Sequence, residues 1–191
     1  MLQPNQFNTV GLRNLILDVA ADPRDRIDGV RLFGQQAGGD AVELLALCLK
    51  ENDSLMIRAT LETLGRILDP RAKRMLRDWL SQPERSEALL APAIKAVARQ
   101  RDREALTVLR QLANRASPST CLAIVSALCQ IDGEAGYDMA MQIFDLLDEP
   151  WRHAAAGFMQ MSLTEAEPSA DDREREAIQR VLRHIKPWVV G

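Results

Sequence analysis

Residues 57–72, IRATLETLGRILDPRA, combine the apolar spacing of a helix with a glycine and an Asp-Pro pair. Its apolar residues recur at three- and four-residue spacing, as in an amphipathic helix: Leu61, Leu64, Ile67 and Leu68. Gly65 stands among them, although glycine inside a helix costs about 1 kcal/mol relative to alanine. Asp69-Pro70 then gives a helix start, because Asp caps the first turn and Pro fits the first helical position. The stretch predicts two helices, with Gly65 where another helix comes close.

The same pattern occurs earlier in the chain. A shift of 31 residues sets Asp22 on Asp53 and Gly34 on Gly65. Further matches are Val30 with Leu61, Phe33 with Leu64, Ala41 with Ala72, Leu44 and Leu45 with Met75 and Leu76, and Leu49 with Leu80. Such self-similarity is the signature of a repeat array. We expect both glycines to lie where the two helices of one repeat cross.

Carrying this register forward gives a series of helix N-caps. Residues with a side-chain oxygen recur at spacings of 31, 33, 31 and 31, and they can accept hydrogen bonds from a first helical turn: Asp22, Asp53, Ser86, Ser117 and Asp148. Second helices are expected to begin near Asp40, Asp69, Asp102 and Gly133. Each unit is therefore predicted to be a pair of helices.

These boundaries predict an all-α protein, an α-solenoid of about five antiparallel helix pairs in a single domain over residues 1–191. The units lie near 22–52, 53–85, 86–116, 117–147 and 148–186. A helix over 9–21 is expected to cap the N-terminal end. In the last unit we expect a helix over 149–162, a polar loop over 162–172 and a helix over 173–186, because end repeats are atypical.

Composition supports helices and a soluble, cytoplasmic protein. Apolar residues make up 47% of the chain but aromatic residues only 4%, a mixture that favours helix packing over sheets. The start, MLQPNQFN, does not have the pattern of a secretory leader, and no apolar run approaches the length of a membrane span. Cys48, Cys121 and Cys129 stand in apolar surroundings without CxxC spacing, so they are expected to be reduced core residues.

Residues 53–72 resemble a HEAT repeat of the short bacterial, phycobilin-lyase-like type. The matching positions are Asp53, Ile57, Arg58, Leu64, Gly65, Asp69, Pro70 and Ala72. The resemblance covers roughly residues 22–160, and the other units match in part, with Ile27, Ala91, Leu122 and His153 in the place of Arg58. It implies that Asp53 and Arg58 are structural, because these motif residues hydrogen-bond between neighbouring repeats of the family. The resemblance is specific for the fold rather than for a function.

No catalytic or metal-binding motif stands out. His153 and His184 are the two histidines, and neither HExxH nor a His-Glu pair occurs; the di-iron hydroxylases that the fold includes depend on such pairs. We therefore expect no enzyme activity, no cofactor and no metal. A net charge of -3 argues against a nucleic-acid-binding solenoid. A lyase-type subunit that attaches a bilin or another small molecule remains the enzyme alternative.

The charge distribution suggests where a partner binds. Residues 58–115 carry 13 Lys and Arg against 7 Asp and Glu, whereas residues 116–172 carry 1 against 10. In the repeat register the cations Arg74, Arg77, Arg103 and Arg110 belong to second helices, which line the inner face in the family. The next unit presents Asp138, Met141 and Asp145 there. These side chains form either a solvated face or a binding strip whose charge changes sign along the array.

The C-terminal end carries two apolar features. PWRHAAAGFMQM (150–161) contains Trp151, and KPWVVG (186–191) leaves Trp188, Val189 and Val190 beyond the last helix. Our first interpretation is that they fold back to close the final repeat, since exposed apolar patches are rare. The alternative is a homodimer contact through Trp151 and Trp188. Together these patterns predict a non-catalytic adaptor or scaffold for an unidentified protein or peptide partner.

Overall fold

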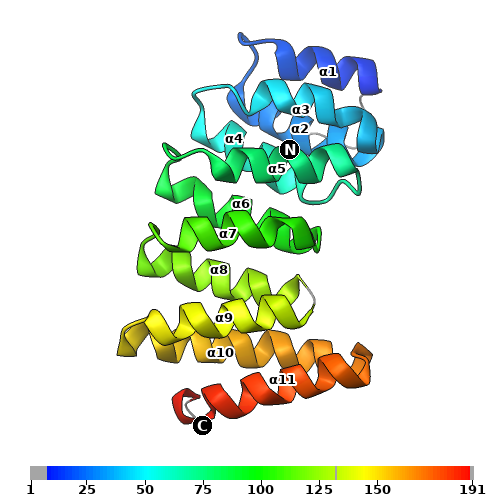
Figure 1. The fold of residues 1–191 in the computed structure, drawn as a ribbon. Coiled ribbons are helices and arrows are strands. Elements are labelled where there is room, and N and C mark those ends of the chain that lie inside the picture. The colour runs from blue at the N-terminus through cyan, green and yellow to red at the C-terminus, as the bar shows by residue number, and fades with distance from the viewer. Residues whose placement is uncertain (1–7, 132, 190–191) are drawn as a thin grey trace. The chain divides into compact units, whose positions relative to one another are not determined.

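The computed structural model describes residues 8–131 and 133–189, and every regular element in these ranges is a helix. The α-helices are α1 (Thr9–Leu17), α2 (Pro23–Ala37), α3 (Val42–Cys48), α4 (Ser54–Leu64), α5 (Pro70–Ser81), α6 (Glu87–Arg99), α7 (Leu106–Ala113), α8 (Pro118–Gln130), α9 (Glu134–Leu146), α10 (Glu149–Ala166) and α11 (Asp172–Ile185) (Figure 1). Short 3-10 helices are η1 (Gly38–Ala41), η2 (Arg103–Ala105), η3 (Glu167–Ser169) and η4 (Lys186–Trp188). The all-α prediction is confirmed.

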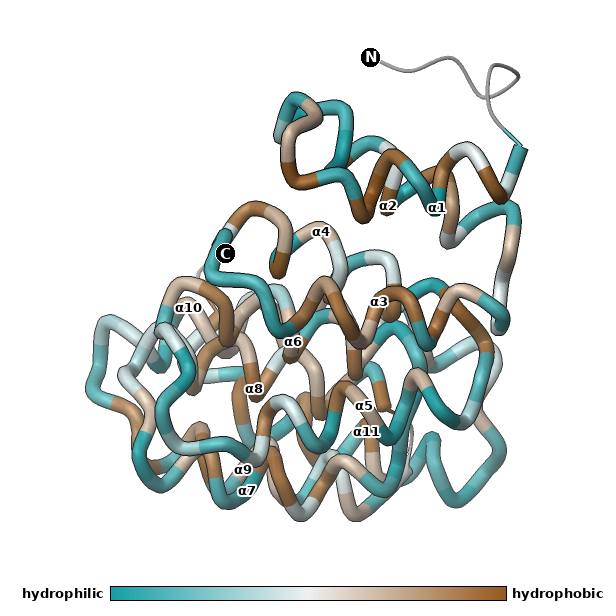
Figure 2. The backbone as a smooth tube through the Cα atoms, turned by 90° about the horizontal axis from the view of Figure 1, so that it is seen from above, coloured by the Kyte–Doolittle hydropathy of each residue, from teal (hydrophilic) through white to brown (hydrophobic). Residues whose placement is uncertain are grey.

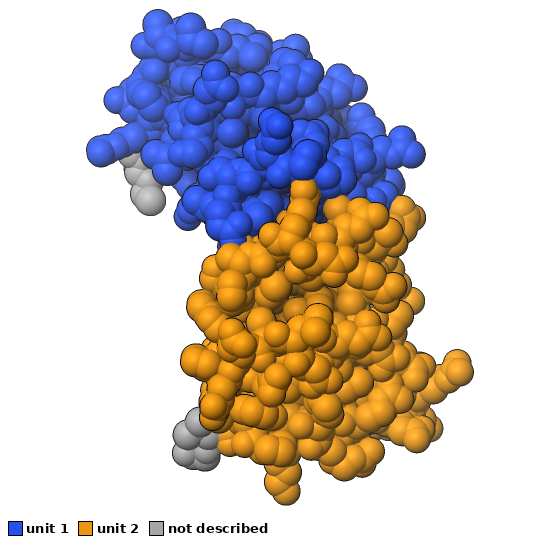
Figure 3. Space-filling model, turned by 60° about the vertical axis from the view of Figure 1, so that its left-hand side comes forward, with its two compact units in different colours: residues 1–100 blue, residues 101–191 orange. Residues whose placement is uncertain are grey.

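The chain forms two compact units, residues 1–100 and 101–191 (Figure 3). The boundary falls between α6 and η2, inside the predicted repeat 86–116. In the first unit α2 packs against α1 and α4, and α4 packs against α6. The second helices α3 and α5 contact each other and pack on α4, which gives two layers of helices.

The second unit is built in the same way from its own elements. Helix α8 packs against α9 and α10, and α7 contacts both α8 and α9. Helix α11 packs on α9 and α10. In both units the hydrophobic residues run along the helices, while many of the connecting turns are hydrophilic (Figure 2). The largest fully buried side chains include Leu61, Leu64 and Ile94 in the first unit, and Leu109, Tyr137 and Phe144 in the second.

All five predicted N-caps stand at helix starts. Asp22 accepts a hydrogen bond from the amide of Arg24, and Asp53 accepts from the amides of Leu55 and Met56. Asp69, Asp102 and Gly133 precede the second helical elements of their repeats, as predicted. The periodic cap signal therefore located the helix starts, because capping is satisfied by neighbouring residues alone.

Two predicted helix boundaries are wrong. Helix α1 ends at Leu17, since Asp18 adopts an extended conformation and its carboxylate accepts from the amide of Ala20. Helix α10 continues to Ala166 through the segment predicted as a loop over 162–172. Leu163 is fully buried four residues after buried Met159, so the apolar face of the helix extends one more turn.

Gly65 is the C-cap of α4 rather than an interior residue. The chain turns there, so Leu68 does not share the buried face of Leu61 and Leu64; it is 88% exposed. A Cβ added at Gly65 would lie 2.7 Å from the Cα and 2.8 Å from the Cβ of Ala96, which belongs to α6. Only a glycine permits this approach.

The glycine contacts join successive units of the predicted repeat register. A Cβ at Gly34 in α2 would collide with the side chain of Thr63 in α4. The pairs α2–α4 and α4–α6 each bring together the first helices of neighbouring repeats. The prediction that Gly34 and Gly65 mark the crossing of two helices within one repeat is therefore wrong.

Two buried polar side chains hold the ends of helices in the first unit. The Nε and Nη2 of Arg26 donate to the carbonyl of Ile16 at 3.0 and 2.8 Å, and Nη2 also pairs with Glu51 at 2.8 Å. The Nε2 of Gln100 donates to the carbonyls of Leu64 and Ile67 at 2.6 and 3.0 Å. The Arg26 bonds satisfy the Ile16 carbonyl, which the end of α1 leaves without a helical partner. The Gln100 bonds add to the turn hydrogen bonds that the Leu64 and Ile67 carbonyls accept from the amides of Ile67 and Asp69.

Candidate functional site: the charged surfaces of the two units

The predicted cations are divided between the two units. Arg74 is exposed and Arg77 half-buried on α5 of the first unit, whereas Arg103 in η2 and Arg110 in the last turn of α7 are exposed in the second. Arg74 and Arg77 therefore belong to the first unit, and Arg103 and Arg110 to the second. Whether the four side chains make one strip stays a prediction.

Helix α5 presents a surface that we call the α5 cation face, formed by Lys73, Arg74 and Arg77. Lys73 lies four residues before Arg77 and Arg74 lies three residues before it, so each of these two side chains is a neighbour of Arg77 on the helix surface. Lys73 and Arg74 have no hydrogen-bond or ion-pair partner in the described part of the chain. Arg77 interacts within the chain. The face arises because Ala72, Leu76, Trp79 and Leu80 turn the opposite side of the helix inward.

Arg71, at the start of the same helix, has a structural role. Its Nη2 donates to the carbonyl of Gly39 at 2.9 Å and to Asp69 at 3.0 Å, which ties α5 to η1. The hydrogen bonds from Arg71 lower the pKa of Asp69, and those same bonds raise the pKa of Arg71. The side chain of Arg71 is therefore already hydrogen-bonded within the chain, and we do not include it in the α5 cation face.

The predicted acidic residues line a groove of 610 Å³ between α9 and α11. Asp138 pairs with Arg180 at 2.8 Å, and Asp145 pairs with His184 at 2.8 Å. Met141 lies between them in the sequence and is half-buried. The two carboxylates are thus paired with the last helix, which sequence reasoning did not anticipate because their partners lie about 40 residues away.

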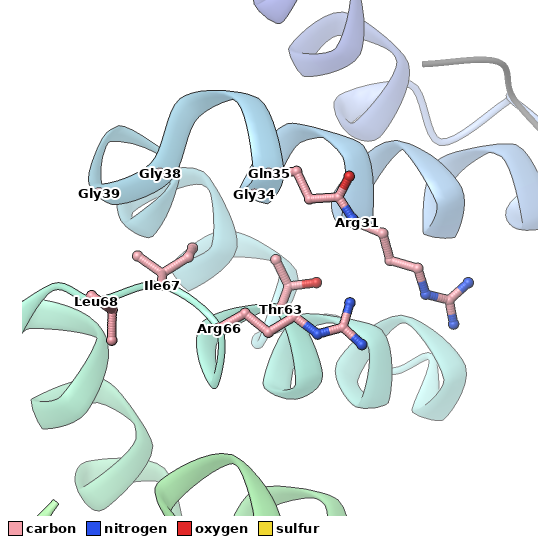
Figure 4. Close-up of a pocket in the computed structure, with 9 residues that line it drawn as sticks. All are labelled: Arg31, Gly34, Gln35, Gly38, Gly39, Thr63, Arg66, Ile67 and Leu68. Atoms are coloured by element: carbon pink, nitrogen blue, oxygen red, sulfur yellow. The ribbon is translucent and has the colours of Figure 1, made fainter. Parts of the chain in front are cut away.

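A second hollow, of 410 Å³, lies in the first unit at the C-terminal ends of α2 and α4 (Figure 4). Its lining residues are Arg31, Gly34, Gln35, Gly38, Gly39, Thr63, Arg66, Ile67 and Leu68. Of its three glycines, Gly38 leaves open space where a Cβ would lie, whereas Thr63 and Asp69 occupy the corresponding space at Gly34 and Gly39. The side chains of Arg31 and Arg66 extend toward the same side of the hollow in Figure 4.

Sequence reasoning missed this hollow, although one signal was available. In the 31-residue register Gln35 corresponds to Arg66, so the stacking of repeats could have placed these two residues together. The side chain of Arg66 is exposed and has no partner among the residues described, whereas Arg31 pairs with Asp28 at 3.1 Å within its own helix. Arg58, which the resemblance assigns a hydrogen bond between repeats, is exposed and forms none in the described part of the molecule.

The cysteines are buried thiols. Cys48, Cys121 and Cys129 are free, as predicted. Burial raises the pKa of Cys48 to about 11 and that of Cys129 to about 12. Because the thiolate is the reactive form, these two thiols are poor nucleophiles at neutral pH. Among residues 8–131 and 133–189, no group of three His, Cys, Asp or Glu residues is arranged to hold a metal ion.

The C-terminal segment folds back on α9 and α10. The ring of Trp188 contacts His153 and Phe144 edge to face, and the guanidinium of Arg152 lies 4.8 Å from its centroid. His153 Nδ1 hydrogen-bonds the carbonyl of Trp188 at 2.8 Å. These contacts agree with the first interpretation, closure of the final repeat. The homodimer through Trp151 and Trp188 stays a prediction, and Val190 lies outside the described residues.

Comparisons with known proteins support the fold alone. No family model matches the chain, and no curated protein matches it. Among solved structures it is similar to the crystal structure of an engineered protein from the Northeast Structural Genomics Consortium. The TM-score is 0.52 and the sequences are 16% identical, over 96% of this chain and 98% of that one. Across the described residues, no helix has the length and apolar character that crossing a membrane requires.

Proposed function

We propose that this chain is a HEAT-like α-solenoid that acts as a non-catalytic adaptor and binds an acidic segment of a protein partner. The observation that carries the proposal is the α5 cation face. Lys73 and Arg74 each lie one turn before Arg77 on a helix whose other side is buried, and neither is neutralised by a described carboxylate. Rigid helices that present aligned side chains are what repeat scaffolds use for binding.

The second unit contributes charge of the same sign. Arg103 and Arg110 are exposed on its second helical elements. Asp138 and Asp145, by contrast, already have partners on α11, and the proposed binding surface does not include them. A cationic face meeting an acidic segment would speed association and select partners by charge.

The proposal predicts that reversing charge on α5 weakens capture of the partner. We expect Lys73→Glu/Arg74→Glu to reduce recovery of the proteins captured from the source lysate by about tenfold or more, because two attractive contacts become repulsive. The matched control is Arg58→Glu/Lys95→Glu. It makes the same charge change at two exposed, unpartnered positions on α4 and α6, and is expected to retain recovery within about twofold.

Quantitative mass spectrometry of the captured proteins measures the difference, and circular dichroism checks that both variants fold. Equal capture by the two variants would contradict the proposal. Visible absorbance that copurifies with the chain would favour the lyase alternative. Salt-dependent retention on heparin by the wild-type chain, lost in the α5 variant, would favour nucleic acid.

A further inference from the structure

We propose that the hollow between the ends of α2 and α4 is a binding site for a peptide carboxylate with a neighbouring apolar side chain. The inference rests on the proposed function, since it assigns the hollow to an acidic segment of a protein partner. It goes beyond that function by naming a second site, outside the α5 cation face, and the chemistry that the site recognises.

The polar end of the hollow offers hydrogen-bond donors. In the described ranges Arg66 has no acidic partner, and the side-chain amide of Gln35 has no hydrogen bond. Arg31 uses Nη1 for Asp28, which leaves its other N–H groups available. In Figure 4 Gln35 and the two arginines, which come from facing segments, lie along one end of the hollow. Guanidinium groups with an amide beside them suit a carboxylate, which accepts several hydrogen bonds through its two oxygens.

The opposite end of the hollow is apolar. Leu68 is 88% exposed there, beside the buried side chain of Ile67. The Thr63 hydroxyl already donates to the carbonyl of Ala59 at 2.7 Å, so this residue presents its methyl group near Gly34. Covering Leu68 would remove apolar surface from water, and this favours an apolar group next to the carboxylate.

The size and charge of the hollow favour a small ligand. A volume of 410 Å³ is near the lower end for ligand pockets and accommodates side chains rather than a whole helix. Asp28 and Asp69 lie beside the hollow and offset part of the cationic charge, which disfavours a polyanion. A free phosphate would leave the apolar end uncovered. The combination fits a short acidic and apolar peptide segment.

The test uses four probes with the isotope-labelled full chain: acetyl-Ala-Glu-Leu-Ala-amide, its Gln and Ser analogues at the Glu and Leu positions, and acetate. We expect the Glu-Leu peptide to give saturable NMR shifts at the amides of Gly34, Gly38, Gly39, Ile67 and Leu68. Each analogue should bind at least about fivefold more weakly, because each lacks one of the two contacts. Acetate binding as tightly as the peptide, or equal binding by either analogue, would overturn the proposal.

Variants identify the side chains responsible. Arg31→Gln/Arg66→Gln should weaken binding of the Glu-Leu peptide at least about fivefold, whereas Arg24→Gln/Arg58→Gln, which alters two exposed arginines on the same helices, should leave it within about twofold. Lys73→Glu/Arg74→Glu should also leave it nearly unchanged. If the Glu-Leu peptide shifts only amide signals of α5, the hollow is refuted as a binding site, whereas the proposal for the α5 cation face stands. If the Glu-Leu peptide binds in the hollow but Lys73→Glu/Arg74→Glu captures the partner as well as the wild-type chain does, the α5 cation face is refuted as a binding surface. The proposal for the hollow then stands.

Discussion

Replacing Gly65 with leucine is expected to lower the free energy of unfolding by about 3 kcal/mol or more, through overpacking against α6. The reason is steric, because even a Cβ would lie 2.7 Å from the Cα of Ala96. Backbone atoms of a helix cannot rotate away as the end of a side chain can. Urea unfolding followed by circular dichroism measures the change.

Alanine at position 65 gives a sharper test, because open space and a close contact predict stability changes of opposite sign. The φ of Gly65 is −62°, which alanine adopts without strain, so Gly65→Ala in open space would stabilise the chain by about 0.4–1 kcal/mol. Against Ala96 we expect a loss of about 1–3 kcal/mol instead. Gly157 in α10 is the matched control. A Cβ there meets nothing within 4 Å, and alanine should stabilise by about 0.5–1 kcal/mol. Stabilisation at both positions would refute the close approach of α4 and α6.

Replacing Arg26 with methionine is expected to lower the free energy of unfolding by about 2–4 kcal/mol. Methionine keeps much of the aliphatic stem but leaves the Ile16 carbonyl and the Glu51 carboxylate without their donor. Arg26 is only 7% exposed, so water replaces the lost bonds poorly. The partial exposure of Glu51 keeps the expected loss at this level, since water solvates its carboxylate.

The control for this prediction is Arg24→Met, two residues earlier on the same helix. Arg24 is exposed, and its side chain has no partner within the described ranges, so its replacement should change stability by less than about 0.5 kcal/mol. Faster amide hydrogen exchange in α1 of the Arg26 variant would show that the guanidinium holds that helix. Equal stability of the two variants would mean that the buried contacts contribute nothing net.

Helix starts were predictable from the sequence because their signals are local. Asp22, Asp53 and Asp69 cap helices through amides two or three residues away, and Pro70 fits the first turn whatever packs beside it. Gly65 indicated that another helix comes close to the backbone at that position. The sequence could not tell which helix fills that space, because the contact with Ala96 depends on how repeats stack.

The candidate surfaces were predictable only in part. Arg74 and Arg77 lie one turn apart on one helix, so local periodicity is sufficient to bring them together. Lys73, which also lies one turn before Arg77, was not among the predicted residues. The pairing of Asp138 with Arg180 joins residues that meet only after α11 has packed on α9. The hollow likewise requires that α2 and α4 end side by side, with glycines at the gap.

Zero-length cross-linking with a carbodiimide shows whether the α5 cation face contacts the partner, because it joins a lysine amine to a carboxylate in contact with it. The chain has four lysines, Lys50, Lys73, Lys95 and Lys186, so each link is readily assigned by mass spectrometry of the complex with the captured partner. We expect links from Lys73 to Asp or Glu residues of the partner. Links from Lys95 or Lys186 without any from Lys73 would contradict it.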